Sequence, residues 1–150
     1  MPKIFVNRNF SLSITPEIKR TYIQMRLKTK VVNTRFIPKT RDILEKSFPR
    51  VLESKCFNDR KLSFYDEVIN TEIGHLFEHI LIENLCQLKI AGGAQSAIFN
   101  GLTNWNWNKD PRGLFHIRVD AGIKDYPIFS PAMKKSIELL NLIIGSTRVN

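Results

Sequence analysis

The chain has 150 residues, of which 43% are hydrophobic and 25% charged, which indicates one globular domain spanning residues 1–150. No apolar run reaches the ~18 residues of a membrane span, and the N-terminus lacks a signal-peptide core, so we expect a cytoplasmic protein without a membrane partner. The net charge is +9, and residues 1–62 carry 15 basic and 5 acidic residues against 8 and 9 in residues 63–150. This asymmetry indicates an anionic partner, either nucleic acid or an acidic peptide or polymer, or else a solvated basic surface.

The first half of the chain predicts two strands and two helical segments. Residues 3–6 are β-prone, residues 7–9 interrupt them, and residues 21–32 open with the period-2 alternation of a half-buried strand. Residues 38–48 have helical spacing and are closed by Pro49. Residues 50–61 predict a loop or short strand, and residues 62–68 a helical turn.

The second half predicts a helix, a hairpin and a final helix. Residues 71–89 form the strongest helix, with Thr71 as N-cap and residues 91–93 as its stop. Two strand-like runs, 97–107 and 114–119, flank turn-forming residues 108–113. Ser130 and Pro131 predict the start of a helix that ends near Gly145. The expected fold is therefore α+β, a mainly antiparallel sheet packed by about three helices.

The helix at 71–89 has an apolar side and a second side made of potential metal ligands. On a helical wheel His75, Glu78, His79 and Glu83 share one face with Glu72 and Cys86. Residues four apart stand one turn above each other, so the two imidazoles can bind one zinc. Glu78 would then act as general base on a zinc-bound water, as in the inverted zincin motif H-x-x-E-H. The alternative is a polar helix face that binds no metal.

A zinc site needs a third protein ligand, which the spacing does not select. Glu83 lies eight residues from His75, about 12 Å of helix rise, so it either reaches inward or holds His79 from outside. Cys56, Asp120 or His116 could complete the site instead. Two cysteines, Cys56 and Cys86, do not suggest a disulfide framework.

Several segments together resemble the N-terminal domain of cyanophycin synthetase. The most specific is GHLFEHILIE, which gives the pattern H-x-x-E-H-x-x-x-E. Further likeness is found in NFSLSITPEIKRTYIQMRL, FPRVLESKC, FNGLTNW, GLFHIRVD and the final AMKKS helix. In some such synthetases this domain is similar to a small zinc metallohydrolase that cuts cyanophycin, an aspartate backbone with arginines on its side chains. In others it serves as a substrate-binding platform.

The resemblance implies zinc on His75 and His79, with Glu83 as third ligand and Glu78 as base. Two departures stand out: Gly101-Leu102-Thr103-Asn104 replaces a frequent Gly-Arg-Thr-Arg, and Lys55 replaces the usual His. We also find no counterpart of the ATP-grasp and Mur-ligase-like domains, so we expect no polymer synthesis.

Three functions follow from these patterns. The first is a zinc-dependent hydrolase of peptide or isopeptide bonds in cyanophycin-like or acidic polymers, with Tyr22, Arg26 or Arg118 as oxyanion partner and Arg26 and Arg118 as substrate-binding residues. The second is a non-catalytic binding module for a polyanionic or peptide partner. The third, nucleic-acid binding through Trp105 and Trp107, is not expected, because the basic residues are scattered and no binding signature is present. A homo-oligomer is left open.

Overall fold

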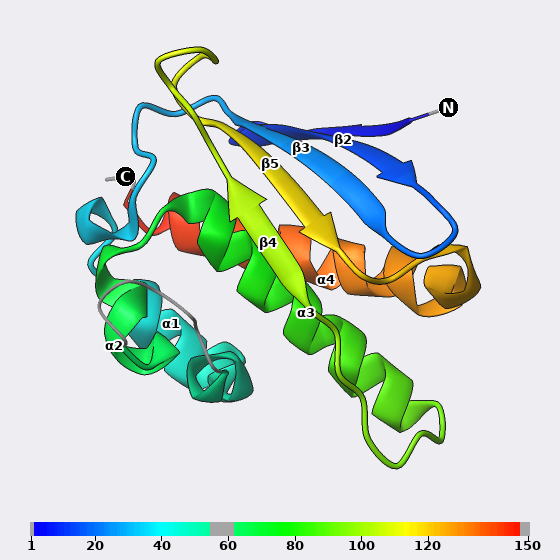
Figure 1. Cartoon of the computed structure of the whole chain (residues 1–150). Coiled ribbons are helices and arrows are strands. Elements are labelled where there is room, and N and C mark those ends of the chain that lie inside the picture. Colours follow the sequence, from blue (N-terminus) through cyan, green and yellow to red (C-terminus); the bar gives the residue numbers. More distant parts are fainter. Residues whose placement is uncertain (1, 55–61, 148–150) are drawn as a thin grey trace.

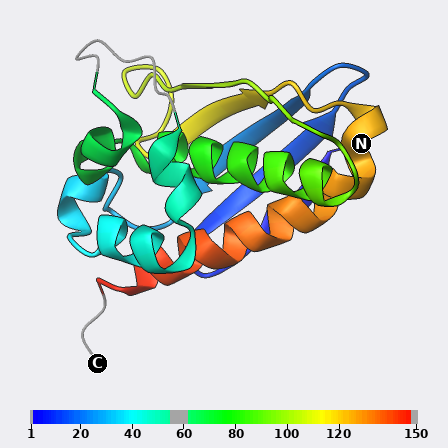
Figure 2. The ribbon, with the colours of Figure 1, turned by 90° about the horizontal axis from the view of Figure 1, so that it is seen from below.

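A five-stranded antiparallel sheet carries its helices on one face. The computed structural model describes residues 2–54 and 62–147. The sheet order is β1-β2-β3-β5-β4, and every neighbouring pair is antiparallel. Figure 1 shows the sheet above the helices, and Figure 2, seen from below, shows α3 and α4 crossing its underside together. The predicted α+β class is confirmed.

The elements have the following bounds. The strands are β1 (Lys3–Val6), β2 (Phe10–Pro16), β3 (Thr21–Leu27), β4 (Gly101–Asn104) and β5 (Leu114–Val119). The α-helices are α1 (Thr40–Ser47), α2 (Phe64–Glu67), α3 (Ile73–Ala91) and α4 (Tyr126–Gly145). Single 3-10 turns are η1 (Thr34–Phe36), η2 (Pro49–Glu53), η3 (Val68–Asn70) and η4 (Ile123–Asp125).

Strand β2 is the element that the sequence analysis missed. Residues 7–9 do not end the sheet but turn it, because Asn7 Oδ1 accepts hydrogen bonds from Asn9 N at 2.8 Å and Phe10 N at 3.0 Å. The chain then returns as β2, whose Phe10, Leu12 and Ile14 are buried beneath the sheet. A local side-chain bond of this kind makes Asn a turn former rather than a simple strand breaker.

Two predicted helix starts were wrong. Helix α3 has Glu72 rather than Thr71 as N-cap, since the Thr71 hydroxyl contacts His75 instead. Helix α4 begins at Tyr126, so Pro127 occupies its first turn and Pro131 lies inside the helix. The strand predicted at 97–107 is shorter, Gly101–Asn104, and that predicted at 21–32 ends at Leu27.

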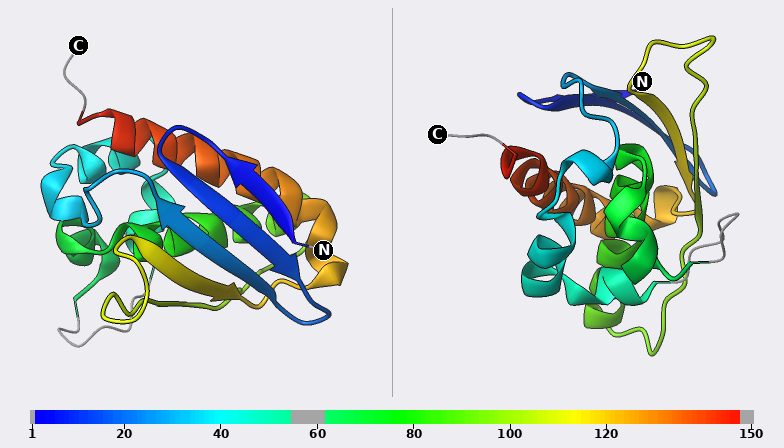
Figure 3. Two further views of the ribbon diagram at one scale, coloured as in Figure 1. Left: turned by 90° about the horizontal axis from the view of Figure 1, so that it is seen from above. Right: turned by 90° about the vertical axis from the view of Figure 1, so that its left-hand side faces the viewer.

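The core lies between the sheet and helices α3 and α4. Side chains of one sheet face, including Met25 and Phe115, are fully buried against the helices. In Figure 3 the view from above shows the sheet covering these helices, with its other face open. A buried hydrogen bond from Asn84 Nδ2 to Ser136 Oγ, 2.9 Å, ties α3 to α4. Within the described residues no helix is long and apolar enough to cross a membrane.

Gly74 sets how closely α3 approaches the sheet. A Cβ at this position would lie 2.3 Å from Phe115 Cγ, inside the aromatic ring of β5. We expect Gly74→Ala to lower the free energy of unfolding by about 1–3 kcal/mol, because the ring or the helix must move. Urea unfolding measures this loss. Gly145→Ala is the matched control, since no atom lies within 4 Å of its Cβ position; an equal loss in both variants would contradict the close-packing argument.

Candidate metal and hydrolase site on helix α3

The start of α3 is anchored to the segment before α1. Ile73 N donates to Val32 O at 2.9 Å, and Thr34 N donates to Thr71 O at 2.8 Å. The N-cap Glu72 accepts a hydrogen bond from Asn33 Nδ2 at 3.1 Å. These contacts fix the first turn of the helix, which carries His75.

The two predicted histidines point their Nε2 atoms at each other. These atoms are 3.1 Å apart, and the ring planes are nearly perpendicular, at 86°. The other nitrogen of each ring is hydrogen-bonded to a hydroxyl group: His79 Nδ1 lies 2.8 Å from Ser54 Oγ, and His75 Nδ1 lies 2.8 Å from Thr71 Oγ1. Such partners on the outer ring nitrogen fix the orientation of a metal-binding imidazole.

The hydrogen bonds of Ser54 assign the tautomer of His79. The Ser54 hydroxyl donates its single proton to Val51 O, 2.7 Å away. His79 Nδ1 must therefore donate to Ser54 Oγ, which leaves the lone pair of a neutral His79 on Nε2. The 3.1 Å contact then takes its proton from His75 Nε2. Moving that proton to His75 Nδ1, where Thr71 can accept it, would leave a lone pair on each of the two Nε2 atoms.

Burial keeps both imidazoles neutral. Burial lowers the pKa of His75, and burial together with the neighbouring His75 charge lowers the pKa of His79 to about 3. Phe64 of α2 covers His79 with a stacked ring, 3.8 Å between centroids and 7° between planes. A neutral imidazole is the form that binds a metal ion, so the protonation state suits the predicted role.

Glu78 is a buried carboxyl beside the histidine pair on the same helix. Its side chain is only 6% exposed, and its Oε1 accepts a hydrogen bond from Thr103 Oγ1 of β4 at 2.7 Å. Burial raises the pKa of Glu78, while the Thr103 hydrogen bond acts in the opposite direction. A buried carboxyl of raised pKa that is anchored at one oxygen can accept and return a proton.

Glu83 is paired with a cation in this structure. Its Oε1 lies 3.2 Å from Arg50 Nε, in a bond that is largely exposed on the arginine side. Among residues 2–54 and 62–147 no three His, Cys, Asp or Glu side chains come together to hold a metal ion. Glu83 as third ligand stays a prediction, and it requires this carboxylate to leave Arg50.

The other proposed ligands lie elsewhere. His116 is on the outer face of β5 and contacts Asp110 Oδ2 at 3.1 Å. Asp120 accepts a hydrogen bond from Asn100 N at 2.7 Å, and Cys56 lies outside the described residues. Cys86 is partly buried at the side of the core, where burial raises the pKa of its thiol.

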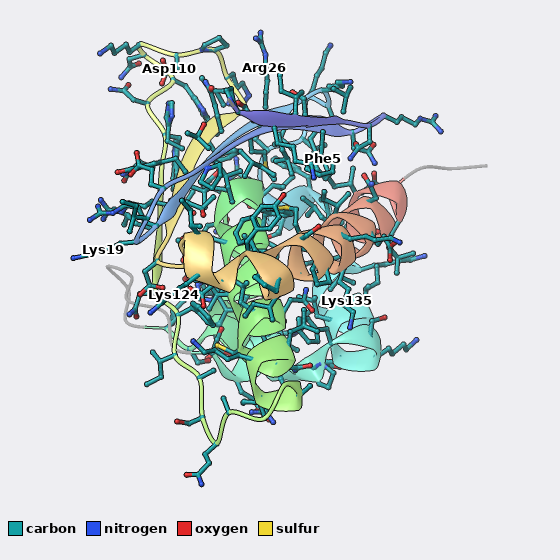
Figure 4. All side chains as sticks on the ribbon, turned by 90° about the vertical axis from the view of Figure 1, so that its right-hand side faces the viewer. Phe5, Lys19, Arg26, Asp110, Lys124 and Lys135 are labelled. Carbon is teal, nitrogen blue, oxygen red and sulfur yellow. The ribbon has the colours of Figure 1, made fainter. Side chains whose placement is uncertain are left out.

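Arg26 and Arg118, predicted to bind substrate, lie on the sheet face away from α3. Arg118 pairs across the sheet with Tyr22, and both side chains line a hollow of about 280 Å³ on that outer face. Figure 4 shows Arg26 above the sheet and Phe5 beneath it, on the helix side. These residues therefore cannot act beside Glu78 in this arrangement. Sequence reasoning also missed Ser54 and Thr103, because folding brings each of them to a residue 25 positions away. It assigned Thr71 to the N-cap, whereas the Thr71 hydroxyl contacts His75, four residues along.

A groove of about 1190 Å³ contains the histidine pair. Its floor is the ligand face of α3, and residues 98–105 form one wall. Four glutamates line it against one arginine: Glu67, Glu72, Glu78, Glu83 and Arg35. The lining of the groove thus holds more carboxyl groups than cations, although the chain carries a net charge of +9.

No protein-family model matches this chain, and no curated protein matches it. The fold and the groove define an α+β domain with a paired-imidazole site next to a buried carboxyl.

The lowered pKa of His79 predicts a loss of stability in mild acid. The unfolded chain binds a proton near pH 6.5, whereas folded His79 does so only near pH 3, so stability falls as pH drops below about 6.5. Between pH 7.5 and 5.0 we expect this residue to remove about 2 kcal/mol from the free energy of unfolding of metal-free protein. Urea unfolding of His79→Leu beside the wild type measures the difference. Parallel pH dependence in the two proteins would contradict the assignment.

Proposed function

We propose that this chain is a zinc-dependent hydrolase of peptide or isopeptide bonds, with His75 and His79 as zinc ligands and Glu78 as general base. The observation that carries the proposal is the 3.1 Å separation between the Nε2 atoms of His75 and His79. The Nδ1 atom of each ring is hydrogen-bonded to a hydroxyl group. Zinc bonds of about 2.0–2.1 Å to both atoms would subtend about 100°, close to the tetrahedral angle. The donor set therefore fits half of a zinc coordination shell.

The residues around this position support hydrolysis rather than structural metal binding. When bound, zinc would polarise a carbonyl and lower the pKa of a water molecule toward ~7. Glu78 would take the proton from the attacking water and pass it to the leaving amine, and Thr103 holds its second oxygen in place during both transfers. The family resemblance implies that Glu83 completes the ligands, for which its side chain would have to move toward the two histidines.

The groove favours a substrate with cationic groups. Its lining glutamates would repel a purely acidic chain and attract guanidinium or ammonium groups. A cyanophycin-like polymer, in which arginines are attached to an aspartate backbone, has such groups, so we favour it over a simple acidic polymer. We place the reaction in the cytoplasm, as predicted from the sequence.

Zinc content tests the proposal directly. Protein purified without a histidine tag and incubated with zinc should hold about one zinc per chain, and His79→Ala should hold none, because one imidazole alone cannot retain the ion. Elemental analysis after dialysis gives both numbers. Zinc-free wild-type protein would overturn the proposed function.

Glu78→Gln separates the base from the ligands. This variant keeps the amide oxygen for Thr103, so we expect normal zinc content and a loss of at least about 100-fold in cleavage of cyanophycin-like peptides, measured by mass spectrometry. His116→Ala is the matched control, since His116 lies on the other face of the sheet. Unchanged cleavage in Glu78→Gln would exclude Glu78 as the base.

The outer sheet face supports a second candidate, a polyanion-binding module. Strands β1 to β5 contain no Asp or Glu, while Arg26 and Arg118 project from the outer face, with Tyr22 directly opposite Arg118. Positive charge attracts an anionic polymer, and on this face it is offset only in part by Asp110, which contacts His116. This function would need neither zinc nor Glu78.

Charge reversal on this face tests the second candidate. We expect Arg26→Glu with Arg118→Glu to weaken binding of polyaspartate about tenfold at low salt. Lys124→Glu with Lys135→Glu is the control of equal charge change, since Figure 4 shows both lysines on the helical side. Fluorescence anisotropy measures both. Equal weakening in the two double variants would indicate net charge alone and contradict a site on the sheet.

A further inference from the structure

Strand β4 is an edge strand that borders the groove. Within the described residues it pairs only with β5, at the end of the order β1-β2-β3-β5-β4. Residues 98–105 all line the groove, opposite the wall that includes Ser54 and Thr71. Figure 1 shows β4 in front of α3, with β5 as its neighbour in the sheet. The outer edge of β4 therefore faces the space above the histidine pair.

The hydrogen-bond register shows which backbone groups of β4 face that space. Asp120 N donates to Asn100 O at 3.0 Å, so these two residues are a hydrogen-bonded pair. Hydrogen-bonded pairs alternate along an antiparallel ladder, which makes Leu102 and Asn104 the next β4 residues bonded to β5. The N–H and C=O groups of Gly101 and Thr103 consequently point away from β5.

The opposite side of β5 confirms this alternation independently. Leu27 N donates to Gly113 O at 3.0 Å, which assigns the odd-numbered β5 residues to bonds with β3. The even-numbered residues His116 and Arg118 are then left for β4. Both sides of β5 give the same result for Gly101 and Thr103.

These two residues also contact the proposed catalytic carboxyl. The Thr103 hydroxyl donates to Glu78 Oε1, and a Cβ on Gly101 would lie 3.0 Å from Glu78 Cγ and 2.8 Å from Ile82 Cδ1. The absence of a side chain at Gly101 lets β4 lie directly on α3. The outward backbone groups of β4 thus run alongside Glu78.

We propose that the substrate binds as an extended peptide segment added to the free edge of β4, through the backbone groups of Gly101 and Thr103. This inference rests on the proposed zinc hydrolase function. Strand addition takes its affinity from main-chain hydrogen bonds and its selectivity from alternate side chains. One set of substrate side chains would face the acidic groove, and the scissile bond would lie over His75, Glu78 and His79. The occupant is a peptide backbone.

The test uses acetyl-trialanine hydroxamate on the zinc-loaded full-length protein, with acetohydroxamate as the control that has no peptide. The hydroxamate group binds zinc, and alanine side chains leave only the backbone for recognition. Amide hydrogen exchange by NMR should show at least about tenfold slower exchange at Gly101 and Thr103 with the peptide probe. Leu102 and Asn104, already bonded to β5, should be unchanged, as should all four residues with acetohydroxamate.

N-methylation of the probe supplies a second measurement. Methylating alternate peptide nitrogens should weaken binding about tenfold at positions that donate to β4 and leave it within about twofold at the others. Two results would overturn strand addition while leaving the hydrolase proposal standing, provided that zinc and the hydroxamate bind. One is an unchanged exchange rate at Gly101 and Thr103, and the other is an affinity that does not alternate along the N-methylated probes. Failure to bind zinc at all would overturn both.

Discussion

The contact of helix α3 with the sheet at Gly74 is the constraint on which the site depends. Because a glycine faces the Phe115 ring, the helix lies closer to β5 than any other residue would allow. Gly101 provides a second close approach, between β4 and the helix at Glu78. Together they hold the ligand face of α3 at the sheet edge, where Thr103 reaches the carboxyl.

Hydroxyl groups orient the chemistry of this site. Ser54 and Thr71 come from segments on either side of α2. The Ser54 hydroxyl is hydrogen-bonded to His79 Nδ1, and the Thr71 hydroxyl to His75 Nδ1. The cost of burying two imidazoles is met by these hydrogen bonds and by the stacked Phe64 ring. The result is a pair of neutral rings whose Nε2 atoms lie 3.1 Å apart. A helix alone could not provide this, since free imidazoles rotate about their side-chain bonds.

The two faces of the sheet carry different charged groups. The outer face presents Arg26 and Arg118 from strands that have no carboxylates of their own, with Asp110 paired to His116, while the helix side carries the glutamates of the groove. The net charge of +9 therefore does not describe the proposed site.

The sequence alone determined the α+β class, the α3 helix and its face of His75, Glu78 and His79, because helical period and residue type are local properties. It also contained β2, whose alternation of Phe10, Leu12 and Ile14 was obscured by an Asn turn. Only the tertiary structure decided that Arg26 and Arg118 lie on the outer face of the sheet, away from α3. It also decided which hydroxyl groups contact the site, namely those of Ser54, Thr71 and Thr103. The Ser54–His79 and Thr103–Glu78 contacts join residues 25 positions apart, and chain folding brings them together, whereas Thr71 and His75 are only four residues apart.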